Sequence, residues 1–171
     1  MKLMKSLGYI LAATQIVFFT NVAVSAVVPK SEKVEREVIV KATVDKTWAA
    51  LTDFGAIDQW HPSVAKAVLE TKNDEDGKAL PHRTLTLKDG GTIVHKETKK
   101  DESIKKYEYK IVEGLPVEGY RAIFKVKPGA NENEAKIIYK ARFYAGADGV
   151  KAVEAFYDAG LPGLKALIEA K

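Results

Sequence analysis

Residues 148–171 read DGVKAVEAFYDAGLPGLKALIEAK, and this stretch decides the class of the fold. Its apolar residues recur at steps of three and four, which predicts a long helix with one apolar face. The positions on that face are Val150, Val153, Tyr157, Leu161, Leu164 and Ile168. Pro162 removes one backbone hydrogen bond from the helix, so we expect a kink there. A helix of this kind must bury its apolar face against another layer.

Strand patterns ahead of the helix predict that layer. Side chains in residues 37–42 alternate with a period of two, and turn residues such as those at 89–91 separate six further apolar runs. The expected strands lie at residues 37–42, 64–71, 82–88, 92–98, 104–112, 120–126 and 136–144. Two short helices are expected at residues 45–52 and 57–60. The predicted fold is therefore α+β: a curved seven-stranded antiparallel sheet with two short helices after the first strand and the long C-terminal helix on its concave face.

The N-terminal segment has the pattern of a secretory signal peptide. Residues 1–6 carry two lysines, residues 7–19 are mostly apolar, and residues 24–26 are small. We expect residues 1–26 to be cleaved, which leaves residues 27–171 as a single domain in the bacterial periplasm. An uncleaved membrane anchor is the alternative, but polar residues interrupt the apolar stretch. We therefore expect no stable membrane anchor after cleavage.

The composition excludes several kinds of chemistry. The 171 residues include no cysteine, so disulfides, cysteine-ligated zinc, Fe–S clusters and a cysteine nucleophile are excluded. The formal net charge of +4 falls to +2 when Lys2 and Lys5 are removed with the leader. With so little net charge on an exported protein, we expect no nucleic-acid partner.

The order of the expected elements over residues 32–171 resembles the helix-grip fold of the START-like superfamily, also called SRPBCC, which includes the Bet v 1 allergens and the polyketide cyclases. Five sequence motifs add detail. They are VDKTWAALTDFG at residues 44–55, WHP at 60–62, RTLTLKDGG at 83–91, RFY at 142–144 and AGLPGL at 159–164. Within the superfamily these motifs resemble the MxaD family, the exported proteins of bacterial methanol oxidation.

The narrower resemblance implies a non-enzymatic periplasmic accessory protein. Such a protein would help methanol dehydrogenase to interact with its cytochrome c acceptor, and both proteins are expected partners. The sequence carries no haem-attachment motif, no GxGxxG and no phosphate-binding loop, so we expect no cofactor.

A hydrophobic pocket between sheet and helix is the second feature that the superfamily implies. Tyrosines and phenylalanines share strand faces with small alanines, and a buried tyrosine hydroxyl needs a partner that a ligand could supply. The residues alone leave a packed core and a cavity equally open. The candidate pocket residues are Trp60, Leu85, Tyr109, Phe124, Tyr139, Phe143, Phe156 and Leu164. An alternative function is therefore a carrier of a small hydrophobic molecule, such as a lipid or a quinone.

Two histidines lie on the strands at either side of the turn at residues 89–90. If that turn has two residues, His82 and His95 are diagonal neighbours on one water-facing side, opposite the buried Leu85. With Glu97 they could in principle bind zinc, but an exposed face disfavours it, and we expect no metal site. A three-residue loop would place the histidines on different faces.

The third histidine, His61, follows a tryptophan in the loop after the short helices. We interpret it as a capping or gate residue at the rim, or as part of a docking surface. A cyclase-like enzyme using His61 or Tyr109 is a further alternative, although no catalytic residue can be assigned.

Four lysines surround an expected hairpin tip and form the remaining docking candidate. They are Lys99, Lys100, Lys105 and Lys106. Such a patch would steer the encounter with an acidic partner protein. A merely soluble tip is the alternative interpretation.

Overall fold

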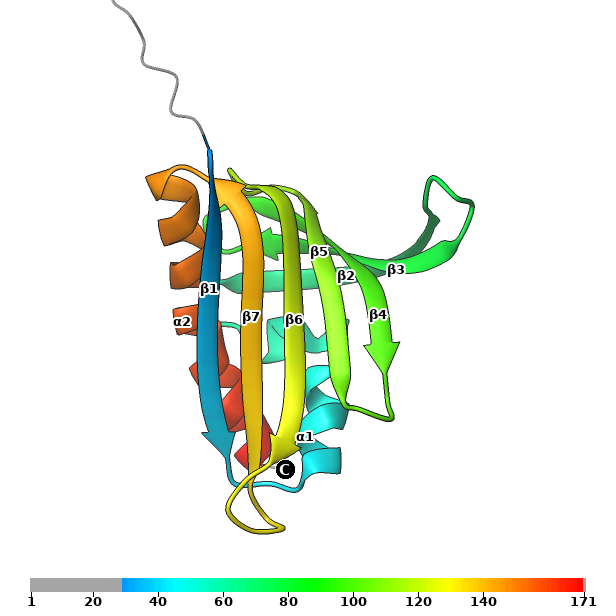
Figure 1. Cartoon of the computed structure of the whole chain (residues 1–171). Helices are drawn as coiled ribbons and strands as arrows, with labels where there is room; N and C mark the ends of the chain where they lie inside the picture. The colour runs from blue at the N-terminus through cyan, green and yellow to red at the C-terminus, as the bar shows by residue number, and fades with distance from the viewer. Residues whose placement is uncertain (1–28, 171) are drawn as a thin grey trace, which may run out of the picture.

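The computed structural model describes residues 29–170, and its elements follow the predicted order (Figure 1). In chain order they are β1 (Lys30–Val40), α1 (Val44–Leu51), the 3-10 helix η1 (Ala56–Gln59), β2 (Val64–Asn73), β3 (Ala79–Leu87), β4 (Thr92–Asp101), β5 (Lys106–Glu113), β6 (Glu118–Pro128), β7 (Ala135–Ala145) and α2 (Ala147–Ala170). The predicted leader, residues 1–26, lies outside the described residues. Within residues 29–170, no helix combines the length and hydropathy needed to cross a bilayer.

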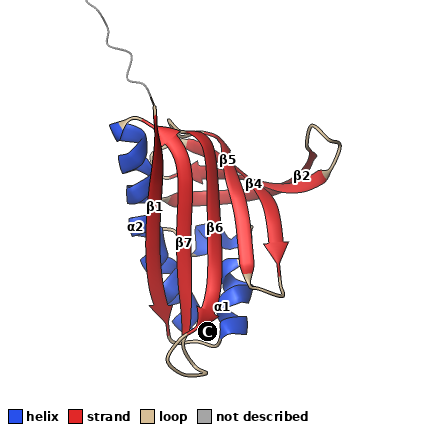
Figure 2. Ribbon diagram, in the orientation of Figure 1, coloured by secondary structure: helices blue, strands red, loops and turns tan. Residues whose placement is uncertain are grey.

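All seven strands form one antiparallel sheet in the order β1-β7-β6-β5-β4-β3-β2. Irregular pairing interrupts the register in β2, β4 and β6, and bulges of this kind bend strands. Figure 1 shows the resulting curvature: β2 and β3 run across the view, whereas β1, β7 and β6 run along it. Both α-helices lie on one side of the sheet (Figure 2). The predicted fold class is confirmed.

Alternation of side chains explains which face of the sheet is buried. In β7, Ile137, Tyr139 and Phe143 are almost completely buried, whereas Lys140 and Arg142 between them face outward. The predicted apolar face of α2 packs onto the inner side of the sheet, and the helix continues through Pro162. The core therefore fills the space between α2 and the sheet.

The turn between β3 and β4 differs from the expected two-residue turn. Leu87 N–H donates a hydrogen bond to the Gly91 carbonyl at 2.8 Å, so three residues form the loop, and Gly90 has a φ of 91°. Three-residue hairpin loops commonly use a glycine in this left-handed region.

The longer loop shifts the register by one residue, so His95 pairs with Arg83 and His82 pairs with Lys96. His95 consequently lies on the inner face with the buried Leu85, and the prediction that both histidines share a water-facing side is wrong.

Candidate functional site

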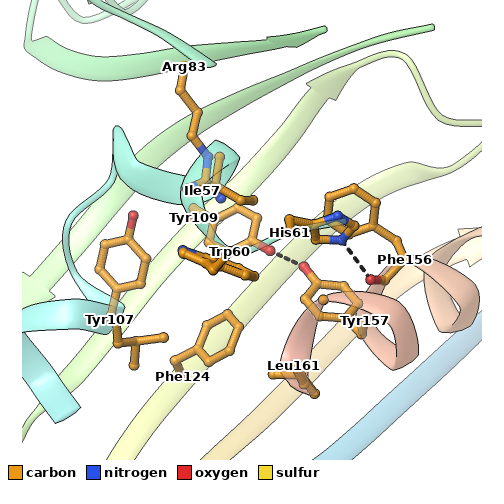
Figure 3. Close-up of a pocket in the computed structure, with 12 residues that line it drawn as sticks. Ile57, Trp60, His61, Arg83, Tyr107, Tyr109, Phe124, Phe156, Tyr157 and Leu161 are labelled. Atoms are coloured by element: carbon orange, nitrogen blue, oxygen red, sulfur yellow. Dashed lines mark hydrogen bonds between the residues drawn. The ribbon is translucent and has the colours of Figure 1, made fainter. Parts of the chain in front are cut away.

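A small cavity lies between the inner face of the sheet and α2 (Figure 3). Its volume is about 20 Å³, which is room for roughly one water molecule. The lining residues are Leu51, Ile57, Trp60, His61, Arg83, Tyr107, Tyr109, Phe124, Phe156, Tyr157, Gly160 and Leu161. Any larger occupant requires the surrounding elements to move apart.

The predicted pocket residues divide into two groups. Trp60, Tyr109, Phe124 and Phe156 line the cavity. The other four are buried in the core around it and do not line it: Leu85, Tyr139, Phe143 and Leu164. Leu85 belongs to a separate cluster beneath β2, β3 and β4. Of the eight predicted pocket residues, four therefore line the cavity and four belong to the core packed around it.

Four tyrosines form a cluster at one side of the cavity, which we call the tyrosine cluster: Tyr109, Tyr120, Tyr139 and Tyr157. The Tyr120 hydroxyl lies 2.7 Å from that of Tyr139 and 2.6 Å from that of Tyr157, and Tyr157 also bonds Tyr109. The rings of Tyr139 and Tyr157 stack at 3.7 Å. These phenols satisfy one another, so they need no ligand.

Burial keeps three of these phenols protonated. It raises the pKa of Tyr109 to about 12, and it raises the pKa values of Tyr120 and Tyr139 well above the usual 10. These three side chains therefore carry no charge at neutral pH.

Arg83, which the sequence analysis did not single out, is the charged residue of the cavity. It lies on the inner face of β3, is only 6% exposed, and lines the cavity. Its Nε donates to His95 Nδ1 at 2.9 Å, and its Nη1 donates to the Phe54 carbonyl at 2.9 Å. The guanidinium carbon lies 4.3 Å from the centre of the Phe54 ring and 5.4 Å from that of Tyr109. Two hydrogen bonds and two aromatic faces therefore hold the side chain in place.

His95 supports the arginine as a neutral imidazole. Because Nδ1 accepts the Arg83 hydrogen bond, the ring proton lies on Nε2, and Nε2 has no hydrogen-bond partner. Burial lowers the pKa of His95 well below 6.5, and the charge of Arg83 lowers it further. His95 therefore positions Arg83 without adding charge.

His61 joins the loop after η1 to α2. Its Nε2 lies 2.8 Å from the Phe156 carbonyl, its Nδ1 accepts the Ser63 N–H at 3.2 Å, and its ring stacks on Phe156 at 3.9 Å. Burial lowers its pKa. Both ring nitrogens are engaged, so neither is free to act as a base in this conformation. Only 2% of His61 is exposed, so the interpretation as a docking residue is wrong here, because the loop folds the ring onto the helix.

Two glycines of α2 allow this close contact. A Cβ added at Gly160 would lie 2.4 Å from His61 Cδ2, and one at Gly163 would lie 1.9 Å from the Trp60 carbonyl oxygen. Neither position can hold a larger residue unless the loop moves. We call this contact between residues 60–62 and α2 the latch.

The lysine tip is mostly neutralised by neighbouring carboxylates. Lys105 pairs with Asp45 at 3.0 Å and with Glu102 at 2.5 Å, Lys99 pairs with Asp101 at 3.5 Å, and Lys106 pairs with Glu108. In residues 29–170, only Lys100 of the four lacks an ion pair. Glu102 also accepts a hydrogen bond from Trp48 Nε1 at 2.5 Å. The tip therefore fastens α1 to the sheet, and it presents less free positive charge than four lysines suggest.

The described part of the chain holds no group of three or more histidine or carboxylate side chains arranged to bind a metal ion. His82 lies away from the other histidines, with its Nδ1 3.0 Å from the Leu80 carbonyl.

Comparisons with known proteins place this fold in a family. The sequence profile of the polyketide cyclase / dehydrase and lipid transport family matches residues 31–169. No curated protein matches the sequence significantly.

Solved structures share the fold at low sequence identity. An uncharacterized protein from Bacillus thuringiensis is 21% identical, with a TM-score of 0.66 over 80% of this chain and 98% of its own. Norcoclaurine synthase from Thalictrum flavum, in complex with dopamine and hydroxybenzaldehyde, is 18% identical, with a TM-score of 0.62 over 91% of this chain and 96% of its own. The Zhui aromatase/cyclase from Streptomyces sp. R1128 is 16% identical, with a TM-score of 0.64 over 82% and 94%. The profile match covers most of the sequence, and the chain belongs to the polyketide cyclase / dehydrase and lipid transport family.

Proposed function

We propose that this protein binds a small hydrophobic molecule between α2 and the sheet and acts as a carrier instead of an enzyme. The family fits hydrophobic-ligand binding. The single observation that carries the proposal is the aromatic lining, in which Trp60, Phe124 and Phe156 surround the cavity. Aromatic side chains give a large contact area for an apolar ligand.

Binding requires an open state, because ligand pockets usually enclose about 300–1,000 Å³ and this cavity holds about 20 Å³. The latch is the contact whose release would enlarge it. One histidine hydrogen bond and one ring stack connect the loop to α2 at this point. Carrying a ligand in this way needs motion of the loop or the helix, and no bond-making group.

The experiment is a titration with the neutral fluorescent probe N-phenyl-1-naphthylamine. We expect its fluorescence to rise on binding, and we expect Leu161→Phe, which fills the cavity, to weaken that binding. Leu167→Phe is the matched control, because Leu167 lies on the same helix but does not line the cavity. Absence of binding to the native protein, or equal loss in both variants, would contradict the proposal.

We also propose a second function, in which the protein is an exported accessory factor of methanol oxidation. Its support is the set of MxaD-like motifs and the leader-like residues 1–26. Its partners would be methanol dehydrogenase or its cytochrome c, met in the periplasm. Within the described tip, Lys100 is the lysine left to steer such an encounter.

A pull-down from periplasmic extract tests this second proposal. We expect either partner to be recovered at low ionic strength, with recovery falling as salt is added. Lys100→Glu should reduce the recovery, whereas Lys127→Glu on β6 serves as a control of equal charge change. Failure to recover both proteins at low ionic strength would contradict the accessory role.

A further inference from the structure

A purely apolar ligand does not explain why the cavity contains the buried positive charge of Arg83. A guanidinium taken out of water is costly unless an anion compensates its charge. Within residues 29–170, no carboxylate forms an ion pair with Arg83. Its two acceptors are a backbone carbonyl and a neutral imidazole nitrogen, so no anion is in direct contact with the guanidinium.

The arginine also has N–H groups on the cavity side that make no hydrogen bond. Its five N–H groups make two hydrogen bonds, and neither of them uses Nη2. Figure 3 shows the side chain extending from β3 toward Ile57 at the cavity. The guanidinium group is therefore held in place through Nε and Nη1, and its remaining N–H groups are available to a bound ligand.

Tyr107 supplies a second unpaired donor to the same cavity. Its hydroxyl is buried and has no hydrogen-bond partner in the described structure, although the ring lines the cavity. The tyrosine cluster pairs its hydroxyls, so lack of a partner is not a general property of this core. Buried polar groups normally have partners, and a missing partner at a cavity wall indicates a place for a ligand.

One carboxylate lies near this place without being paired there. Glu97 on β4 is close enough to influence both Arg83 and Tyr107. Within residues 29–170 it forms no ion pair with the arginine and no hydrogen bond of normal geometry with the Tyr107 hydroxyl. His95 positions the guanidinium through Nδ1 and contributes no negative charge. The wall formed by β3, β4 and β5 thus offers positive charge and donors but no paired anion.

We propose that the ligand of this cavity is an apolar acid whose carboxylate binds Arg83 and Tyr107 while its hydrocarbon or aromatic body packs against Trp60, Phe124 and Phe156. The inference rests on the proposed carrier function and names its ligand class. A carboxylate matches the fork of an arginine and accepts a phenolic hydrogen bond. Entry of the acid requires the latch to open, because the closed cavity holds about one water molecule.

Two probes of nearly equal shape separate the acid from the apolar body. 2-Naphthoate carries the carboxylate, and 2-naphthamide replaces it with a neutral group. Isothermal titration at pH 7.5 should show that the native protein binds 2-naphthoate about tenfold or more tightly than 2-naphthamide, since charge-assisted hydrogen bonds exceed neutral ones. Equal affinities for the two probes would overturn the acid site and leave the carrier function standing. Absence of binding by either probe would overturn both.

Variants assign the preference to Arg83. Arg83→Gln should reduce the affinity ratio of the two probes to about one while 2-naphthamide binding is retained. Arg121→Gln on the outer face of β6 is the control and should keep the native ratio. A native ratio in Arg83→Gln would overturn the assignment.

A measurement on the unmodified protein covers the case in which Arg83→Gln does not fold. The Arg83 Nε–H is buried and hydrogen-bonded, so its nitrogen-15 resonance can be followed by NMR. 2-Naphthoate should shift that resonance and 2-naphthamide should leave it nearly unchanged. Equal shifts with both probes would contradict carboxylate binding at Arg83.

Discussion

The tyrosine cluster and the group formed by Arg83, His95 and Tyr107, which we call the Arg83 wall, lie on the same inner face of the sheet and are buried to a similar extent. They differ in how their polar groups are hydrogen-bonded. In the cluster, the hydroxyls of Tyr120, Tyr139 and Tyr157 bond one another. At the wall, the Tyr107 hydroxyl and His95 Nε2 have no partner in the described structure. The first region therefore stabilises the fold, whereas the second keeps donors available for a ligand.

Removing a whole ring from the tyrosine cluster should give the largest effect on stability. Tyr139→Ala deletes a buried side chain that stacks on Tyr157 at 3.7 Å. We expect the free energy of unfolding to fall by about 3–5 kcal/mol, as for other buried aromatic residues. Urea denaturation followed by circular dichroism measures this change.

The control is Tyr144→Ala on the outer face of the same strand, where the side chain is 52% exposed. Its effect should stay within about 0.5 kcal/mol. A loss below about 1 kcal/mol in Tyr139→Ala would show that the cluster does not stabilise the fold.

Removing a single hydroxyl from each region should distinguish them directly. Tyr120→Phe removes the hydroxyl partner of Tyr139 and one of the two hydroxyl partners of Tyr157, so the free energy of unfolding should fall by about 1–3 kcal/mol. Tyr107→Phe removes a hydroxyl that has no partner, so its cost should be close to zero. Equal losses in the two variants, measured by urea denaturation, would remove the distinction between the regions.

Acid should destabilise the protein through the two histidines at the cavity. The pKa values of His61 and His95 are lowered from 6.5 by burial. Below pH 6.5 the unfolded chain therefore binds more protons than the folded chain, and the free energy of unfolding falls as pH falls through the window below 6.5. Carboxylates with lowered pKa values, such as Glu108 and Asp158, add to the loss only nearer their usual values of 4.5 and 3.8.

Thermal denaturation between pH 7.5 and 5.0 measures this dependence. His95→Gln should flatten the profile between pH 6.5 and 5.0 while it keeps an acceptor for Arg83. His82→Gln is the control and should leave the profile close to that of the native protein. If His95→Gln leaves the pH dependence of thermal stability unchanged, His95 is not the source of the acid sensitivity.

The smallest effect is expected at the lysine tip, where pairs are exposed to water. Lys99→Ala breaks the contact with Asp101, and the free energy of unfolding should change by less than about 1 kcal/mol. Added salt should weaken the effect further. A larger loss, measured by urea denaturation, would mean that this surface contributes to stability as much as the buried cluster does.

The sequence predicts the architecture well because periodicity is a local signal. The three- and four-residue steps in residues 148–171 identify α2. The period-two run at residues 37–42 and six further apolar runs between turn residues identify the seven strands. The register between β3 and β4 could not be obtained in this way, because one extra residue in the loop at residues 88–90 reverses which face each side chain occupies.

The site was less predictable, because the partners of its polar residues are set by the tertiary structure. Alternation with Leu85 would place Arg83 on the inner face, but an arginine within a strand is normally expected to face water. Its burial depends on the Phe54 carbonyl, which lies 29 residues away in sequence, and on His95, whose place on the inner face follows from the three-residue loop. Lys105 pairs with Asp45 of α1, which is far from it in sequence, so the charge of the tip could not be judged from its lysines alone.

The most direct test of the account is the ratio of 2-naphthoate to 2-naphthamide affinity in the native protein and in His95→Glu. The substitution places a carboxylate beside Arg83, where the structure has only a neutral imidazole. If the guanidinium of Arg83, which forms no ion pair, selects the ligand, isothermal titration will show a native preference for the acid of about tenfold or more. This preference will disappear in His95→Glu while 2-naphthamide binding persists. An equal preference in both proteins, or no preference in the native protein, would contradict the account.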